Sequence, residues 1–230
     1  MNKKNAVVTG GAAGLGFEMV QRLIAQGWMV HVIDIDGERM DELNQRFDSD
    51  SYRGYVGDIS DENFINATFA CIAAMGHIDL LINNAGQPSF KTPIAYHGED
   101  IDKCLKGLKG MVLCCVAALK EDGEDDIKIA NVMSTAATRG NAEESVYCAA
   151  KWGEKGYTES LKAAYKGSSV KIVGVYPGGI DTDFYKESRD YVSLEKQHSF
   201  MRAGDLAEVI VRNLVCEEDL TVSDIRIDRN

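Results

Sequence analysis

Residues 9–16 read Thr-Gly-Gly-Ala-Ala-Gly-Leu-Gly, and they join an apolar run, Ala6–Thr9, to an amphipathic stretch, Gly14–Gln26. The valines of the run are typical of a buried strand, and the large apolar residues of the stretch fall on one face of a helix. Glycines at such a junction let the backbone turn sharply, and they leave the positive N-terminus of the helix open to an anionic group. A glycine cluster alone is equally typical of a plain turn, so its position between strand and helix is what indicates an anion site.

The same alternation of short apolar runs and helix-length amphipathic stretches continues along the whole chain. The runs predict seven strands, at Ala6–Thr9, Met29–Asp34, Tyr52–Val56, Ile78–Asn83, Ile127–Ser134, Val170–Tyr176 and Ser223–Asp228. The stretches predict helices at Gly14–Gln26, Asp61–Met75, Glu99–Leu119, Glu144–Tyr165 and Gly204–Leu214. Several runs are apolar throughout, as strands covered on both faces are. The alternation predicts an α/β protein with a doubly wound, parallel seven-stranded sheet and helices on both faces, in a single domain over residues 1–230.

Asp34, at the end of the second predicted strand, indicates what the glycine loop binds. In a Rossmann fold a carboxylate at this place accepts hydrogen bonds from the adenosine ribose of a dinucleotide and repels a 2′-phosphate. No Arg or Lys stands at positions 11–13 or 35 to receive such a phosphate, so the sequence favours NAD(H) over NADP(H). The alternative is that Asp34 and Asp36 form an ordinary turn. Asp58, after the third strand, would bond the adenine amine, although a carboxylate that begins a helix looks the same.

Composition narrows the partners and the compartment. The chain has 25 Lys and Arg against 36 Asp and Glu, a net charge of −11, which argues against nucleic acid or an anionic membrane as a partner. Its six cysteines and four histidines show no metal-ligand spacing, so we expect no metal site and a reduced compartment. The N-terminus is too poor in apolar residues for a secretory signal, and the longest apolar run, Met111–Leu119, is too short to span a bilayer. These observations predict a cytoplasmic protein.

Tyr147 and Lys151 are the first candidates for chemistry. They stand at i and i+4, which places a phenol and an ammonium on one helix face. With nine tyrosines in the chain such a pair arises readily by chance, and a buried tyrosine covered by a lysine is the alternative. Ser134 adds weight to the catalytic interpretation, because it ends the fifth predicted strand, at the sheet edge where open α/β sheets bind ligands.

Five motifs in order resemble the short-chain dehydrogenase/reductase family, in its compact single-domain branch. Thr-Gly-x-x-x-Gly-x-Gly lies at residues 9–16, Asn-Asn-Ala-Gly at Asn83–Gly86, Asn-x-x-Ser at Asn131–Ser134, Tyr-x-x-x-Lys at Tyr147–Lys151, and Pro-Gly-x-x-x-Thr at Pro177–Thr182. The resemblance covers residues 9 to 182. It implies an NAD(P)(H)-dependent oxidoreductase that interconverts a small alcohol and a ketone or aldehyde by hydride transfer.

The resemblance also implies a role for each matching residue. Tyr147 is the general acid in reduction, or the base in oxidation, and Lys151 lowers its pKa and bonds the nicotinamide ribose. Ser134 holds the substrate oxygen against the tyrosine. Asn84 fastens the adenosine side of the cofactor and the central strands, while Ile180 and Thr182 hold the carboxamide. The implied cofactor contacts are Gly10, Gly14, Leu15, Gly16, Asp34, Asp58, Asn84, Ala85, Gly86, Tyr147, Lys151, Pro177, Gly178, Ile180 and Thr182.

Gly107 departs from the family pattern. The family places Asn-x-x-Gly in the fourth long helix, where the asparagine anchors a water that links the lysine to solvent, and here the stretch reads Gly107-Leu108-Lys109-Gly110. Glycine has no side chain for this task, so an extra water held by backbone carbonyls would have to fill the space. Gly107 is the support in the sequence for an alternative function, a dinucleotide-binding sensor or regulatory protein with weakened catalysis.

Two further expectations follow from the resemblance. Family members assemble through the fourth and fifth long helices, so we expect a homo-oligomer, a dimer or tetramer. The stretch Met111–Val116 and Trp152 belong either to that interface or to the core. Phe184, Tyr185 and Tyr191 follow Thr182 in a region that resembles the family's mobile substrate lid, where they either line an apolar pocket or simply pack.

Overall fold

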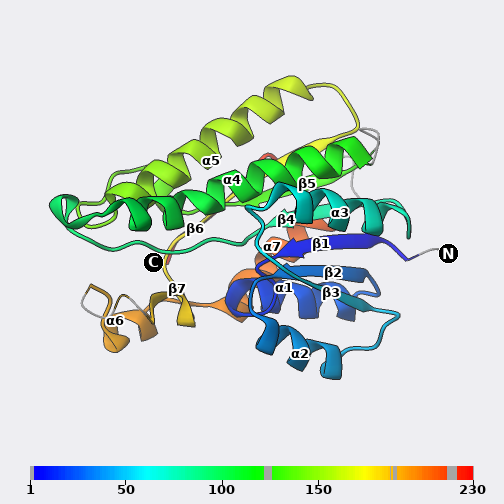
Figure 1. Ribbon diagram of the computed structural model, residues 1–230, viewed down its shortest axis with the longest axis horizontal. Helices are drawn as coiled ribbons and strands as arrows, with labels where there is room; N and C mark the ends of the chain where they lie inside the picture. The colour runs from blue at the N-terminus through cyan, green and yellow to red at the C-terminus, as the bar shows by residue number, and fades with distance from the viewer. Residues whose placement is uncertain (1–2, 122–125, 187, 189–190, 217–221, 230) are drawn as a thin grey trace.

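A parallel seven-stranded sheet forms the centre of the protein (Figure 1). Its strands are β1 (Asn5–Thr9), β2 (Met29–Asp34), β3 (Tyr52–Val56), β4 (Leu80–Asn83), β5 (Lys128–Val132), β6 (Lys171–Pro177) and β9 (Asp224–Ile227). They lie in the order β3-β2-β1-β4-β5-β6-β9, and each pairs in parallel with its neighbour. The strand order reverses between β1 and β4, and ligands bind at the carboxyl ends of strands at such a reversal.

Helices cover both faces of this sheet in the computed structural model, which describes residues 3–121, 126–186, 188, 191–216 and 222–229. The helices are α1 (Gly14–Ala25), α2 (Gly37–Arg46), α3 (Glu62–Ala73), α4 (Gly98–Glu121), α5 (Ser145–Ala164), α6 (Leu194–His198) and α7 (Ala203–Leu214). In Figure 1, α3, α4 and α5 lie above the sheet, and α1, α2 and α7 lie below it. A short parallel pair, β7 (Ile180–Asp181) and β8 (Met201–Arg202), lies beyond the end of β6.

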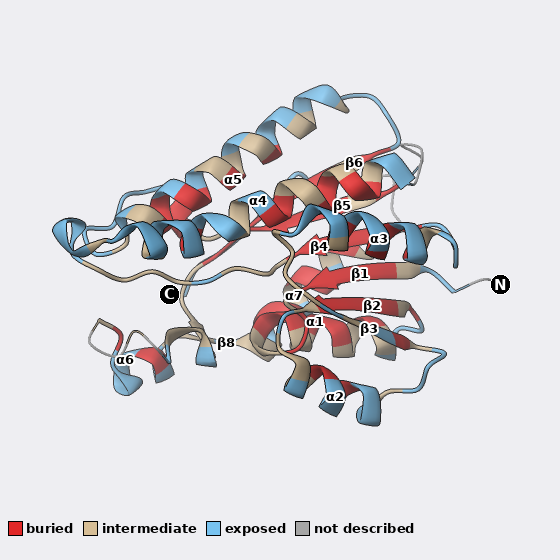
Figure 2. Cartoon of the chain, viewed as in Figure 1, coloured by how far each residue is buried: buried red, intermediate tan, exposed pale blue. Residues whose placement is uncertain are grey.

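Two apolar clusters, one on each face of the sheet, hold the layers together. One joins the inner residues of α1 and α7, such as Met19 and Ile210, to β1, β2, β4, β5 and β6. The other joins Phe69 of α3 and Cys114 of α4 to the opposite face of the central strands. Figure 2 shows the buried residues in the strands and on the helix faces turned toward them. Both faces of the sheet are therefore dry, which explains the continuous apolar runs of its strands.

The predicted α/β architecture and its seven parallel strands are confirmed, with three local differences. Helix α2 was not predicted, because only Met40 and Leu43 of its ten residues are buried and they form no visible apolar stripe. Strand β5 ends at Val132, so Ser134 lies two residues beyond the strand, at the start of a 3₁₀ turn. Helix α6 and the β7–β8 pair were also not predicted.

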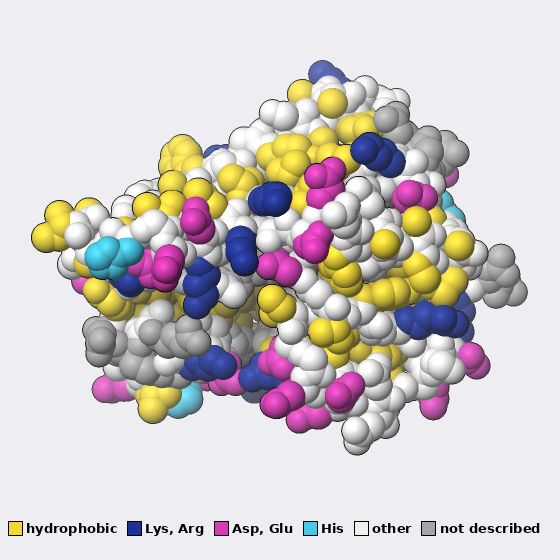
Figure 3. Space-filling view, viewed as in Figure 1, with side chains coloured by type: hydrophobic (Ala, Val, Ile, Leu, Met, Phe, Trp, Pro, Cys, Tyr) yellow, Lys and Arg dark blue, Asp and Glu magenta, His cyan; other side chains and the backbone are white. Residues whose placement is uncertain are grey.

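The surface charge and the lengths of the helices can be compared with the predictions about nucleic-acid, membrane and subunit partners. Acidic and basic side chains intermix over the face seen in Figure 3, and no continuous basic patch covers that face. Among the described residues, no helix combines the length and apolar character needed to cross a bilayer. Met111 and the cysteines that follow it pack in the core, whereas the Trp152 side chain is 50% exposed.

Candidate functional site

A cleft of about 600 Å³ opens at the carboxyl ends of the strands, where the strand order reverses. Residues from the glycine loop, from the ends of β2, β4, β5 and β6, and from α5 line it together. The lining residues predicted from the sequence are Gly10, Gly14, Leu15, Asp34, Asp58, Asn84, Ala85, Gly86, Ser134, Tyr147, Lys151, Pro177, Gly178, Ile180 and Thr182. A volume of this size suits a small molecule or cofactor. The fold thus brings these segments, far apart in sequence, to one cavity.

The glycine loop is tied to the end of β4 by hydrogen bonds. The Asn84 side-chain amide donates to the carbonyl oxygens of Thr9 (3.2 Å) and Gly10 (3.0 Å). The Thr9 hydroxyl accepts from the backbone amides of Asn84 (3.0 Å) and Ala85 (3.1 Å). Gly10 has a φ of +64°, and a Cβ there would stand 2.8 Å from the Cα of Ala85. Only glycine fits both the backbone conformation and this approach, so the loop is held open beside the α1 N-terminus.

Gly16 lies behind the loop rather than on the cleft wall. A Cβ at this position would collide with the Gly10 carbonyl and with the Asn84 side chain. The structure therefore gives Gly16 a packing task, in that it lets α1 approach the loop. The sequence motif alone does not separate this task from direct cofactor contact.

Asp34 and Asp58 occupy the β2 and β3 sides of the cleft. The Asp34 carboxylate accepts hydrogen bonds from the backbone amides of Ala12 (2.9 Å) and Asp36 (3.1 Å), so its orientation is fixed. Asp36 itself caps α2. Burial alone would raise the pKa of Asp58, but hydrogen bonds from Ser60 and Lys106 outweigh it and hold that pKa below its ordinary value. Both side chains thus have a structural task and also line the cavity.

Tyr147, Lys151 and Ser134 meet at the α5 side of the cleft. Tyr147 is 8% exposed and Lys151 5%, and the Lys151 ammonium lies 5.6 Å from the centre of the Tyr147 ring. Ser134 lines the same cleft as Tyr147. Burial raises the pKa of Tyr147, the carboxylates of Glu154 and Glu144 raise it further, and the Ser134 side chain, as a hydrogen-bonding neighbour, lowers it. In the absence of a cofactor the phenol is therefore protonated.

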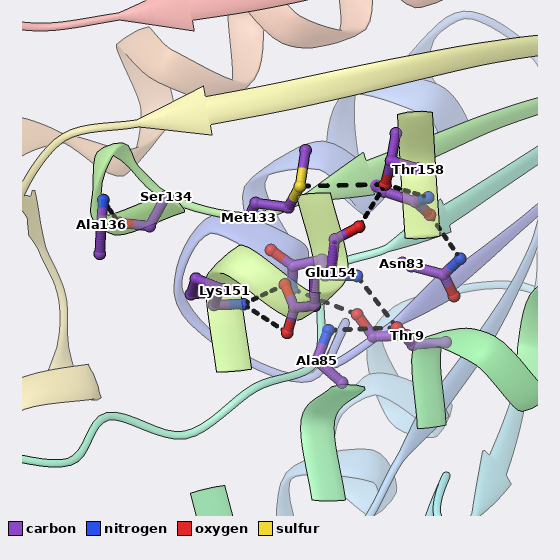
Figure 4. A network of polar contacts seen from close by, with 11 residues as sticks. Thr9, Asn83, Ala85, Met133, Ser134, Ala136, Lys151, Glu154 and Thr158 are labelled. Atoms are coloured by element: carbon purple, nitrogen blue, oxygen red, sulfur yellow. Dashed lines mark hydrogen bonds and ion pairs between the residues drawn. The ribbon is translucent and has the colours of Figure 1, made fainter. Parts of the chain in front are cut away.

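Glu154 is a site residue that the sequence analysis missed. Its carboxylate lies 2.8 Å and 3.1 Å from the Lys151 ammonium, one distance for each oxygen, and the residue is 1% exposed (Figure 4). Glu154 stands three residues after Lys151, on the same helix face. A glutamate in a helix is ordinarily a solvated side chain, and its burial depends on the packing of α4 against α5, which no local pattern reveals.

Aromatic rings surround the outer part of the cleft. Phe184 packs edge-on against Tyr147, with 6.3 Å between the ring centres, and Tyr185 packs against Phe184 at 5.4 Å. Phe90 contacts both Tyr185 and Tyr191. Thr182 accepts a hydrogen bond from the Phe184 amide and lies close to Gly14 of the glycine loop. Phe184 and Tyr185 line the cavity beside Tyr147, and in the structure all these rings also pack against one another.

The donor set fits a dinucleotide better than a metal ion. The described residues include no group of three or more His, Cys, Asp or Glu that could hold a metal. The open glycine loop, the α1 N-terminus beside it and the fixed carboxylate of Asp34 form a cradle for a phosphate-linked nucleotide. All six cysteines are free thiols, four of them buried.

Comparisons with known proteins agree with this geometry. The family model described as short chain dehydrogenase matches residues 4–192. A D-threitol dehydrogenase from Mycolicibacterium smegmatis is 29% identical over 195 residues, which cover 83% of this chain and 75% of that protein. A 2-dehydro-3-deoxy-L-rhamnonate dehydrogenase (NAD(+)) from a Sphingomonas species is 33% identical over 77% of this chain and 72% of its own. A crystal structure of a short-chain dehydrogenase/reductase from Vibrio parahaemolyticus superposes with a TM-score of 0.86 at 27% identity, covering 98% and 99% of the two chains.

Proposed function

This chain belongs to the short-chain dehydrogenase family of NAD(P)-dependent oxidoreductases, and we propose that it interconverts a small alcohol and a ketone or aldehyde, with NAD(H) as the preferred cofactor. One observation carries the proposal. The buried Tyr147, with Ser134 and the Lys151 ammonium nearby, lines the same cleft as the glycine loop. A proton donor and a nucleotide cradle thus share one cavity.

Each residue of the site has a defined task in this reaction. Tyr147 gives its proton to the substrate oxygen during reduction and takes it back during oxidation. Ser134 donates a hydrogen bond to the same oxygen, and it thereby stabilises the developing charge and fixes the substrate against the phenol. Lys151 places a positive charge beside the phenol, which favours the phenolate when a proton must be accepted. The bound nicotinamide supplies or accepts the hydride.

The glycine loop and Asp34 would hold the cofactor. The amides at the start of α1 would bind the pyrophosphate, and Asp34 would accept hydrogen bonds from the ribose hydroxyls. Pro177, Gly178, Ile180 and Thr182, which line the same cleft, would hold the nicotinamide. The preference for NAD(H) rests on the Asp34 carboxylate, whose charge would repel the extra phosphate of NADP(H).

The test is NADH oxidation with a panel of ketones and aldehydes. We expect turnover by the wild type and a loss of about 100-fold or more in Tyr147→Phe, because the proton donor is gone. NADH binding, followed by its fluorescence, should survive in this variant. Tyr165→Phe, at the far end of the same helix, is the matched control and should keep full activity. Undiminished turnover in Tyr147→Phe would refute the assigned role.

We further propose that the protein acts in the cytoplasm as a homo-oligomer built through α4 and α5. Trp152 on α5 is 50% exposed, and Ile101 and Leu105 on α4 are each 37% exposed. Large apolar side chains gathered on two neighbouring helices are typical of a protein interface. Sedimentation of the wild type should give a dimer or tetramer, and Trp152→Glu should shift it toward the monomer.

A further inference from the structure

The ion pair between Glu154 and Lys151 is buried, whereas ion pairs between neighbouring residues of a helix are ordinarily exposed to solvent. The two side chains are 2% and 6% exposed, and both carboxylate oxygens contact the ammonium (Figure 4). Moving both charges out of water carries a large desolvation cost, which an apolar pair of similar volume would avoid. The five family motifs assign Glu154 no task, so its burial beside Lys151 calls for a separate explanation.

Gly107 explains how the carboxylate fits. A Cβ at Gly107 would stand 3.7 Å from the Glu154 Oε1 atom, 3.6 Å from the Cα of Gly86 and 3.9 Å from the Ala85 carbonyl oxygen. A Cβ at Gly86 would stand 3.5 Å from the Lys151 Nζ atom. A Cβ at residue 107 would thus already be in van der Waals contact with the Glu154 carboxylate, and a longer side chain pointing the same way would compete with it for space. The missing asparagine and the buried glutamate are two parts of one arrangement.

We propose that Glu154 is a positioning residue of the active site, which orients Lys151 from α5 in a chain that has no side chain at residue 107 of α4. Its carboxylate holds the Lys151 ammonium in place, and it balances the ammonium's charge. The inference rests on the proposed function, because it gives the ion pair a role in catalysis. It also gives the glycine at residue 107 a packing role beside this pair.

The charges around the pair give Glu154 a measurable effect on Tyr147. Among the described residues, the other ionisable groups that act on this region are Glu144 at the N-cap of α5, Cys148 from α5, Cys104 from α4, and Tyr185. Burial raises the pKa of the Cys104 thiol to about 11, so this group is neutral at physiological pH and does not compensate Glu154. The negative charge of Glu154 opposes that of a Tyr147 phenolate. Glu154 therefore favours the protonated phenol, the form that reduces a carbonyl.

The first experiment measures the pH profile of Glu154→Gln, which keeps the side-chain shape and removes the charge. Without the carboxylate, the Lys151 charge acts on Tyr147 uncompensated and stabilises the phenolate. We expect the rising limb of kcat/KM for alcohol oxidation to move toward lower pH by roughly one unit, the scale of one nearby charge. Glu159→Gln is the matched control, because Glu159 pairs with Lys162 at 2.8 Å on the exposed part of the same helix. An unchanged profile in Glu154→Gln would overturn the proposal.

The second experiment needs neither cofactor nor activity. A double-mutant cycle compares the Tm of Gly107→Asn, Glu154→Ala and the double variant. We expect Gly107→Asn to lower the Tm while Glu154 is present, and to raise it in the Glu154→Ala background, where the amide enters the vacated space. If the Tm shift of the double variant equals the sum of the two single shifts, residues 107 and 154 do not compete for the same space, and the proposal is contradicted. A wild type without any turnover would refute the proposed function, and this cycle would still decide the structural part of the inference.

Discussion

The Arg39 guanidinium and the Asp183 carboxylate form an ion pair at the cleft, with 3.2 Å between Nη2 and Oδ2. Arg39 lies near the start of α2, beyond Asp34, and Asp183 follows the short strand β7, so the pair connects two lining segments. The Arg39 Nε atom also lies 3.3 Å from Asp36. The guanidinium charge is thus already shared by two carboxylates, which makes it a poor receptor for a 2′-phosphate.

Asp34→Ser should relax the preference for NADH. The substitution removes the carboxylate that repels the 2′-phosphate and leaves Arg39 as the nearby cation. We expect the ratio of kcat/KM for NADPH to that for NADH to rise by about tenfold or more, as one repulsive charge at a binding site would give. Adding Arg39→Ala should leave most of the gain, because Arg39 is already paired with Asp183 and Asp36. Asp41→Asn, on the exposed face of α2, is the control, and an unchanged ratio in Asp34→Ser would contradict the role of Asp34.

Much of the fold was predictable because its signals are local. The β1 run, the glycine loop and the first turn of α1 are contiguous, so their order alone indicates strand, turn and helix. The helix predicted from Asp61 begins there, and the Asp61 side chain caps α3 by accepting hydrogen bonds from the backbone amides of Asn63 and Phe64. Helix α2 escaped prediction because a polar helix with two buried residues differs little from a solvated loop.

Asn84 should prove necessary for holding the glycine loop in shape. Its side-chain amide donates to the carbonyls of Thr9 and Gly10, so Asn84→Ala removes both hydrogen bonds. We expect the free energy of unfolding to fall by about 1–3 kcal/mol, the cost of unsatisfied buried groups, and the NADH dissociation constant to rise. Urea unfolding and fluorescence titration measure the two effects. Asn213→Ala, on α7, is the control for the titration. Equal NADH affinity in both variants would argue that the Asn84 hydrogen bonds do not hold the glycine loop in its binding shape.

The candidate site was predictable only where its residues lie at a fixed separation along the sequence. Tyr147 and Lys151 stand one helical turn apart, so the sequence places them on one face. Glu154 stands three residues after Lys151 on the same helix face, yet its role depends on Gly107, which comes from another helix. The contact between these two residues exists only after α4 packs on α5, and the same holds for the Arg39–Asp183 pair.

Two glycines of α5 should respond differently to alanine. Gly156 is exposed and an added Cβ would meet no neighbouring atom within 4 Å, so Gly156→Ala should stabilise the protein by about 0.5–1 kcal/mol through helix propensity. A Cβ at Gly153 would stand 2.8 Å from the Leu108 Cδ2 atom, so Gly153→Ala must push α4 and α5 apart or move Leu108. We expect Gly153→Ala to show no such increase in the free energy of unfolding, because the cost of this contact offsets the helix propensity of alanine. Equal stabilisation of both variants in urea unfolding would show that the helices are not in close contact there.

Carbonyl reduction and alcohol oxidation should depend on pH in opposite ways. Burial and the carboxylates of Glu154 and Glu144 raise the pKa of Tyr147, so the free enzyme carries a protonated phenol through the neutral range. Reduction uses this form, and its kcat/KM should stay level from about pH 6 to 9, because kcat/KM reports the free enzyme. Oxidation uses the phenolate, whose fraction rises about tenfold for each pH unit below the pKa, so its kcat/KM should climb over the same range.

Rates with deuterated NADH would show that hydride transfer limits the measured step in the reduction assays. A fall in reduction with a midpoint near neutral pH would mean that the phenolate already forms there. The positive charge of Lys151 would then outweigh burial and both carboxylates at Tyr147. That result would contradict the balance of charges derived from the structure, because Glu154 could not be neutralising the ammonium to the extent that their contact implies.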